Sequence, residues 1–218
     1  MKTITKIGLF FTLVINSQAS ITLDFQAGRA FNSFGTRVLD GTPYALLVSA
    51  DNVFAGGFGL NQGLGTIGNA NTTFSTGQAF TLGSVLGSDT VFGVGVFNGL
   101  ANSGEQGLYA GALPFNLGSN GLAAGLSYAF YFFPGGTLVS NTVTIGNQVG
   151  GINNNRTEAG LQPMVIPADG TTITTGAAST DFGGTLTNAQ FTAVNLVPEP
   201  SALLLSSLGF LALLRRKR

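Results

Sequence analysis

The chain consists mainly of short apolar runs separated by glycine and asparagine, a spacing that is typical of strands and turns. Residues 21–25 alternate between apolar and polar positions, which predicts a half-buried strand with Ile21, Leu23 and Phe25 on one face. Residues 44–48 are continuously apolar and begin just after a turn, as in a strand buried on both faces. Residues 126–133 carry aromatic side chains on both faces and predict a central strand.

Further short strands are predicted along the chain. Residues 91–97 place Phe92, Val94 and Val96 on one face and two glycines on the other, where another backbone or sheet can approach closely. Residues 80–82, 137–145, 164–166, 171–174 and 191–196 are also expected to be strands, whereas 56–70, 117–124 and 146–155 are expected to be loops. The predicted fold is all-β, an antiparallel β-sandwich or jelly-roll-like body.

The first 19 residues have the pattern of a signal peptide. Lys2 and Lys6 form a positive region, and residues 7–15 form a short apolar segment. Ser17 and Ala19 supply the small residues that signal peptidase requires, so we expect cleavage between Ala19 and Ser20. About nine apolar residues are too few to cross a bilayer as an anchor. The N-terminal helix therefore predicts export, with the export machinery and signal peptidase as partners.

The last 22 residues form a second distinct segment. The triplet Pro198, Glu199 and Pro200 is followed by an apolar run at residues 201–214. Both prolines prevent a helix from continuing out of the body, so a new hydrophobic helix starts near Ser201. At 1.5 Å per residue it is about 21 Å long, shorter than the roughly 30 Å hydrocarbon core. The chain ends in four cations, which favour the cytoplasmic side and leave the body outside: Arg215, Arg216, Lys217 and Arg218.

In this order, the triplet, the short helix and the basic end resemble the PEP-CTERM signal of exported proteins from Gram-negative bacteria. The resemblance implies that an exosortase-type intramembrane protease recognises Pro198, Glu199 and Pro200, cuts nearby and passes the protein to the cell surface. It also implies an association with exopolysaccharide. An ordinary C-terminal membrane anchor is the alternative. The predicted organisation is a signal peptide at 1–19, an exported β-rich domain at 20–196 and a sorting tail at 197–218.

The composition excludes several kinds of chemistry. The chain has no histidine and no cysteine, which excludes histidine-based triads, thiol nucleophiles and the usual zinc sites. Residues 20–196 contain three arginines and eight acidic residues, a net charge of −5, so nucleic acid is not an expected partner. Residues 63–68 match the G-x-G-x-x-G spelling, but poor helix sequence follows. We therefore predict no catalytic, cofactor-binding or metal-binding residues.

Three functions from different classes remain open. The leading one is a non-enzymatic cell-surface or extracellular-matrix protein of the envelope or biofilm, tethered to the inner membrane before processing and then surface-bound or released. A carbohydrate-binding module is the alternative, and it would need an exposed aromatic or a loop calcium site, with Asp51 and Asp169 as the nearest candidate ligands. A carboxylate-only hydrolase would need two facing acids. The aromatics in glycine-rich surroundings, mostly expected in the core, are Phe31, Phe34, Phe54, Phe58, Phe74, Tyr109 and Phe115.

The sequence also supports expectations about the aspartates, as turn residues, and about the exposed edges of the sheets. Five aspartates lie in contexts that are typical of turns, where the carboxylate bonds its own backbone: Asp40, Asp51, Asp89, Asp169 and Asp181. Low charge and long apolar strands also raise the hypothesis of edge-to-edge assembly, because charges normally guard sheet edges. An extracellular polysaccharide is the partner that the tail resemblance implies for the body.

Overall fold

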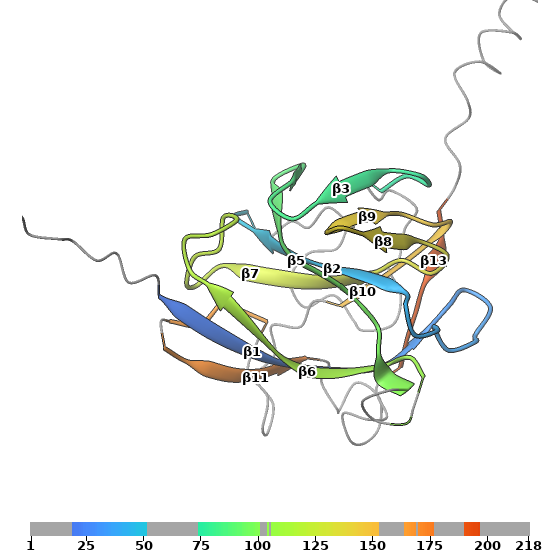
Figure 1. The fold of residues 1–218 in the computed structure, drawn as a ribbon, viewed down its shortest axis with the longest axis horizontal. Coiled ribbons are helices and arrows are strands. Elements are labelled where there is room, and N and C mark those ends of the chain that lie inside the picture. Colours follow the sequence, from blue (N-terminus) through green and yellow to red (C-terminus); the bar gives the residue numbers. More distant parts are fainter. Residues whose placement is uncertain are drawn as a thin grey trace, which may run out of the picture.

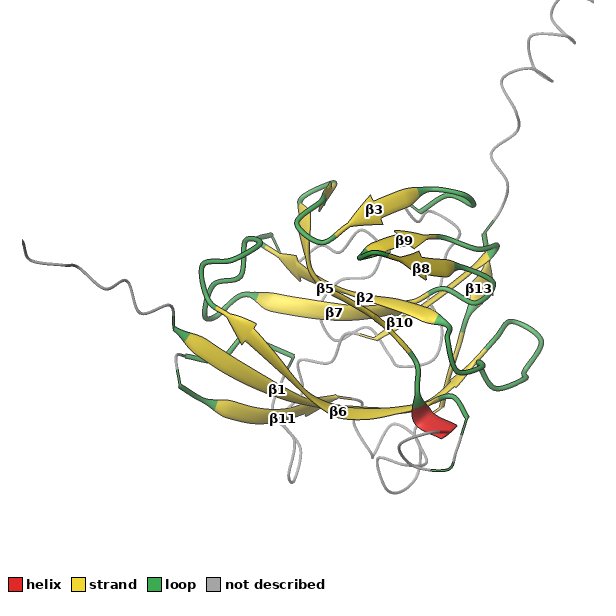
Figure 2. Cartoon of the chain, viewed as in Figure 1, coloured by secondary structure: helices red, strands yellow, loops and turns green. Residues whose placement is uncertain are grey.

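The computed structural model describes residues 19–51, 74–100, 104, 106–152, 164–168, 170–176 and 190–196, which form an all-β body (Figures 1 and 2). The predicted all-β class is confirmed. The predicted signal helix and the predicted tail helix lie outside the described residues. Among the helical residues that are described, none belongs to a segment long and apolar enough to cross a membrane.

A six-stranded sheet forms the centre of the molecule, in the order β13-β10-β7-β2-β5-β4. Its two middle strands, β2 (Pro43–Ser49) and β7 (Ser127–Phe132), are buried at every position. Strand β5 (Asp89–Val96) pairs with β2, and β4 (Val85–Leu86) extends that side. On the other side, β10 (Gln148–Ile152) pairs with β7 and β13 (Val194–Asn195) follows. All pairs in this sheet are antiparallel.

A second sheet is built around the long strand β1 (Ser20–Phe31). Strand β6 (Leu108–Asn116) pairs with β1 in antiparallel fashion. Along the other edge of β1, β11 (Thr172–Gly176) and then β12 (Gln190–Thr192) pair in parallel with successive parts of the strand. The prediction of a purely antiparallel fold is therefore incomplete, because β11 and β12 run parallel to β1. Parallel pairing depends on how the strands are connected, which the periodicity of a strand does not reveal.

A third, small sheet contains β3 (Ala79–Thr81), β9 (Thr142–Thr144) and β8 (Thr137–Val139), in that order. Strands β8 and β9 form a hairpin with Ser140 and Asn141 as its two turn residues. Both have positive φ angles, 48° and 66°, as a type I′ turn requires. The single strand predicted at 137–145 is thus two strands, because this turn lacks the Asn-Gly spelling that normally announces it.

The central sheet separates two hydrophobic clusters, and Figure 1 shows the other two sheets on its opposite sides. In β7, Tyr128, Phe130 and Phe132 belong to the cluster shared with β1, while Ala129, Tyr131 and Phe133, the residue just after the strand, belong to the cluster shared with β9. Alternate residues of a strand point to opposite faces, so a continuously apolar strand packs into both hydrophobic clusters. This confirms the two-sided burial predicted for residues 44–48 and 126–133. The predicted two-sheet sandwich does not describe the whole body, because the small third sheet covers the second face of the central sheet.

Strand β5 departs from the predicted alternation at Phe92. The register passes from Leu46 opposite Gly93 to Leu47 opposite Val91, which leaves Phe92 as the extra residue of a β-bulge. Phe92 then packs in the cluster shared with β1, whereas Val94 packs against the other cluster. The prediction that Phe92 and Val94 share a face was wrong, because a bulge shifts the two-residue period by one position.

Gly95 in β5 and Gly150 in β10 make room for aromatic rings of their own sheet, whereas at Gly93 the ring of Phe115 from the opposing sheet approaches closely, as predicted. The ring of Tyr44 lies over Gly95, directly opposite it in the register, so a Cβ atom at residue 95 would overlap the ring. The ring of Phe132 covers Gly150 in the same manner. Residues 146–155 were expected to form a loop, yet 148–152 are strand β10. Its glycines lower strand propensity but are required under the aromatic rings.

Two further predicted strands are shorter or interrupted. Residues 191–196 are split at Ala193 into the ends of β12 and β13, and Val165 forms only an isolated bridge with Ser127. Strand β6 was not predicted. It is an edge strand that contains Pro114, which lacks an amide hydrogen and is tolerated only where no second neighbour needs one.

Candidate functional site

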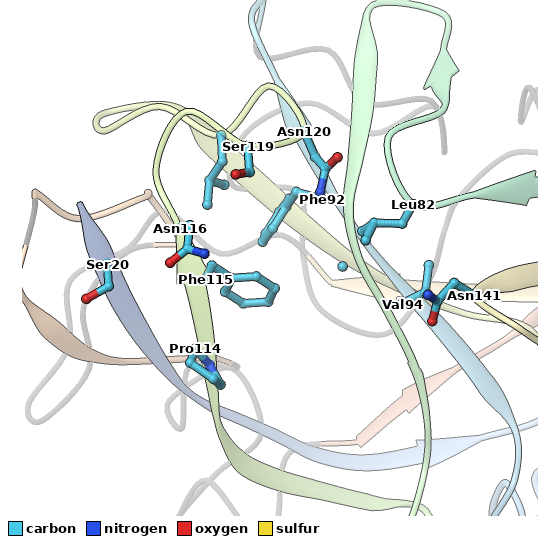
Figure 3. Close-up of a pocket in the computed structure, with 12 residues that line it drawn as sticks. Ser20, Leu82, Phe92, Val94, Pro114, Phe115, Asn116, Ser119, Asn120 and Asn141 are labelled. Atoms are coloured by element: carbon cyan, nitrogen blue, oxygen red, sulfur yellow. The ribbon is translucent and has the colours of Figure 1, made fainter. Parts of the chain in front are cut away.

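A surface groove of about 560 Å³ lies along β5, between the sheet of β1 and β6 and the turns of the small sheet (Figure 3). Its walls come from β5, from β6 and the loop that follows it, and from the turns after β3 and between β8 and β9. Its volume falls within the range of roughly 300–1,000 Å³ that is usual for small-molecule sites. The described residues that line it are Ser20, Leu82, Phe92, Gly93, Val94, Pro114, Phe115, Asn116, Ser119, Asn120, Leu122 and Asn141.

Two aromatic rings form the apolar part of the groove. Phe92 and Phe115 meet edge to face, with ring centroids 5.0 Å apart and planes at 72°. Phe92 also packs edge-on against Tyr128 at 5.8 Å, which holds it from behind. A Cβ atom on Gly93 would lie 3.2 Å from Phe115. The bulge at Phe92 and the bare glycine beside it therefore position the half-buried Phe115 ring in the groove.

A tight loop after β6 supplies part of the polar rim. The amide of Gly118 donates to the carbonyl of Leu122 at 2.8 Å, and Leu122 is buried at 2 % exposure. Asn120 has φ 51°, within the left-handed region that asparagine tolerates better than other side chains. Asn116 and Ser119 complete this side of the groove, and Figure 3 shows Asn116 near Phe115 and Asn120 near Phe92.

The groove has a distinct chemical character. None of the described residues that line it is charged. The carboxamides of Asn116, Asn120 and Asn141 are exposed, and each offers two donors and an acceptor oxygen, while the serine hydroxyls do both. Neutral groups that donate and accept, next to apolar ring surface, match ligands with many hydroxyl groups and apolar C–H faces.

Sequence reasoning identified little of this groove in advance. Phe115 was among the aromatics considered for ligand stacking, but Pro114, Asn116, Asn120 and Asn141 were not singled out. All four are turn-forming or edge-strand residues, whose presence local structure already explains. The only hint in the sequence is the pair Gly118 and Gly121 around Asn120, which indicates a turn-containing loop.

The acidic residues do not gather in the groove. Asp40 accepts a hydrogen bond from the backbone amide of Leu100 at 3.2 Å, and Asp51 accepts one from the hydroxyl of Ser49 at 2.9 Å. Asp89 is fully buried in β5, opposite Ser49, which corrects the expectation of a turn aspartate. Within the described ranges, no three acidic side chains lie close enough together to hold a metal ion. Asp169 and Asp181 lie outside the described residues.

The aromatics considered for ligand stacking have several different environments. Phe34 is 77 % exposed, Phe31 and Phe115 are half-buried, and Phe74 is buried in the cluster shared with β3 and β9. For Tyr109 the structure describes the backbone in β6 but not the side chain, and Phe54 and Phe58 lie outside the described residues. Phe34 is therefore the exposed aromatic among those members of this set whose side chains the structure describes.

The predicted processing sites lie at or beyond the limits of the described body. Strand β1 begins at Ser20, the residue after the predicted signal-peptide cut, and the carbonyl of Ala19 accepts a hydrogen bond from Leu117 at 2.7 Å. Cleavage itself stays a prediction. The sorting residues Pro198, Glu199 and Pro200 and the basic end lie outside the described residues.

Comparisons with known proteins bear on the tail. No match was found among curated proteins or among solved structures. One family model matches, over residues 196–218, and its description is the PEP-CTERM protein-sorting motif. That motif implies an exported protein that is sorted to the cell surface by exosortase. The C-terminal tail of this chain is thus a PEP-CTERM protein-sorting motif, attached to the all-β body.

Proposed function

We propose that the protein is a non-enzymatic component of the cell envelope or extracellular matrix, tethered to the inner membrane by its tail and then released to the surface. The single observation that carries this proposal is the sorting motif at 196–218 on an all-β body. The absence of histidine and cysteine from the chain and the uncharged groove support a binding or structural role.

Terminal peptide mass spectrometry tests the processing part of this proposal. The full chain is produced in a Gram-negative host that contains an exosortase, and the protein is recovered from the membrane, the cell surface and the medium. Surface and medium chains are expected to begin at Ser20 and to end near Pro200. Replacement of Pro198, Glu199 and Pro200 by alanine should leave the chain in the membrane fraction with Arg218 intact. Surface chains that retain Arg218 would contradict sorting by cleavage.

A second candidate function rests on the groove, which we propose as a binding site for a saccharide. Its rim offers carboxamides and hydroxyls, and its interior offers the half-buried ring of Phe115, which packs against the buried Phe92. No described lining residue is acidic, which favours binding over hydrolysis at this place. A matrix protein with such a groove would adhere to the polysaccharide that surrounds the cell.

Saccharide binding in the groove can be tested with substitutions that leave the backbone of the loop after β6 unchanged. Asn120→Gly removes the carboxamide but keeps the left-handed backbone at φ 51°, and Asn116→Ala removes a second one. Each lost hydrogen bond is worth about 0.5–1.5 kcal/mol, so affinity for a neutral polysaccharide should fall about 2- to 12-fold per substitution. Asn98→Ala, an exposed asparagine outside the groove, serves as the matched control. Equal retention of all variants in affinity electrophoresis would contradict a saccharide site here.

A further inference from the structure

The loop at residues 32–36, here called the Phe34 loop, presents an apolar ring to solvent. Phe34 is 77 % exposed, the highest value among the large apolar side chains of the described residues. The other residues of the loop are Asn32, Ser33, Gly35 and Thr36, so none of its side chains is charged. Apolar side chains of this size are usually buried, and an exposed one at a loop tip is a candidate contact for a partner.

The loop is rigidly constructed. The side-chain oxygen of Asn32 accepts hydrogen bonds from the amides of Phe34 at 3.0 Å and of Thr36 at 2.9 Å. The backbone of Asn32 also donates to Thr36 and accepts from Gly35, which has φ +76°. A bridge between Phe31 and Arg37 closes the base of the loop. The exposure of the ring is therefore built into the fold, because four hydrogen bonds within five residues fix the backbone on either side of it.

The same loop is attached to the segment from which the sorting tail departs. The hydroxyl of Ser33 donates to the side-chain oxygen of Asn195 in β13 at 2.9 Å, and its amide donates to the side chain of Gln148 in β10 at 3.0 Å. In Figure 1 the blue loop after β1 and the end of β13 lie at the same end of the body. Asn195 precedes Ser201 by six residues, which span at most about 20 Å of extended chain. Asn195, to which the loop is hydrogen-bonded, thus lies within that distance of the start of the hydrophobic tail segment.

We propose that the Phe34 loop docks on the outer face of the bilayer that holds the tail, with the Phe34 ring inserted among the lipids. This rests on the membrane-tethered intermediate of the proposed function. An uncharged loop enters the interface without desolvating a carboxylate, and the aromatic ring gains from leaving water. The short tether makes insertion intramolecular, so a contact too weak to hold a free protein is sufficient to orient this one. Docking presents residues 196–200 to the membrane in one orientation, as cutting there requires.

Fluorescence quenching in vesicles tests docking, and the absence of native cysteine simplifies labelling. The full chain is reconstituted into vesicles of phosphatidylethanolamine and phosphatidylglycerol that contain a spin-labelled lipid. A dye is attached at Thr36→Cys or, as the matched control, at Ala124→Cys; both residues are exposed, and residue 124 lies in the loop before β7 at the far end of the body. Quenching at residue 36 should exceed that at residue 124 about fivefold. Adding Phe34→Ser should remove most of the difference, and Phe34→Leu should retain it.

The outcomes separate docking from tethering. Sedimentation of the chain with the vesicles reports insertion of the tail and is independent of residue 34. Equal quenching at both sites in chains that do sediment overturns docking and leaves the tether intact. Chains that fail to sediment overturn the tether, and docking with it. Quenching or protection at residue 36 that appears only after an exosortase is added would overturn the bilayer as the occupant in favour of a protein. The same change on adding a polysaccharide would favour a glycan instead.

Discussion

The two faces of the central sheet use the same strands to build different interiors. Toward β1, the cluster contains Tyr44, Phe130 and Phe132 from the middle strands, and the opposing sheet contributes aliphatic side chains such as Ile21 and Leu23. Toward β9, the middle strands contribute the smaller Ala45 and Ala129 as well as larger residues, and rings from outside the sheet, Phe74 and Phe80, complete the packing. The second face is thus closed by the three short strands of the small sheet together with Phe74, which lies just before β3.

The largest test of this comparison removes one ring from each face. Phe130 stacks on Tyr44 at 5.0 Å, and Phe133 meets Phe74 at 5.4 Å and Phe80 at 5.7 Å; both are fully buried. Phe130→Ala and Phe133→Ala should each lower the free energy of unfolding by about 3–5 kcal/mol. Guanidinium unfolding of the mature protein measures this, with Phe34→Ala as an exposed control that changes little. A separate early transition for Phe133→Ala would show that the small sheet unfolds independently.

A smaller effect is expected from filling a space that an aromatic ring already occupies. Gly95→Ala places a methyl group within the ring of Tyr44, so the ring or the strand must move, at about 1–3 kcal/mol. In a Tyr44→Ala background the same substitution should cost much less, because the overlapping ring is gone. Denaturant midpoints of the four proteins in this cycle give the coupling. Additive losses would mean that Tyr44 and Gly95 do not share the space.

Removing a single methyl group from each cluster gives a finer comparison of how closely the two clusters are packed. Ile21 and Ile145 are each 2 % exposed, one in each cluster. Ile→Val at either position should lower the free energy of unfolding by about 0.5–1.5 kcal/mol, and by similar amounts if both interiors are equally close-packed. A markedly smaller loss for Ile145→Val in thermal unfolding would indicate looser packing under the small sheet.

The smallest effect is expected on the outward side of the small sheet. Val139 is 67 % exposed in β8, an edge strand. Val139→Thr keeps the β-branched shape and should change the free energy of unfolding by less than about 0.5 kcal/mol. Size-exclusion chromatography at high concentration should give the same elution volume for both proteins. A variant that elutes later than the parent would instead show that this face is covered by a second copy, as edge-to-edge assembly requires.

The sequence predicted best where burial is uniform. Residues 44–48 and 126–133 indicate two-sided burial without further information, because large apolar side chains occupy both alternating sets of positions and Ser127 is the one non-aromatic polar residue among them. It predicted less well where a glycine has a long-range reason to be present. Gly150 in β10 weakens the local strand signal, yet Phe132 directly opposite requires it, and that pairing is invisible along the chain.

The candidate groove was harder to predict than the core. Its rim residues come from separate elements, β6, the loop after it and the β8–β9 turn, which belong to two different sheets and meet only because both sheets pack beside β5. Asn120 and Asn141 have a local reason to be asparagine in their positive φ angles, so nothing in their residue type announced a shared site. The sorting motif was recognisable because its residues are contiguous.

The parallel pairing of β1 with β11 and β12 also determines how late the second sheet can be completed during folding. The first strand of the body hydrogen-bonds to residues 172–176 and 190–192, close to the start of the sorting tail. A chain that emerges from the ribosome N-terminus first therefore holds β1 without these neighbours until nearly the whole body has been made. Such distant pairings slow folding, because the intervening chain must close into a loop before the strands gain any contact.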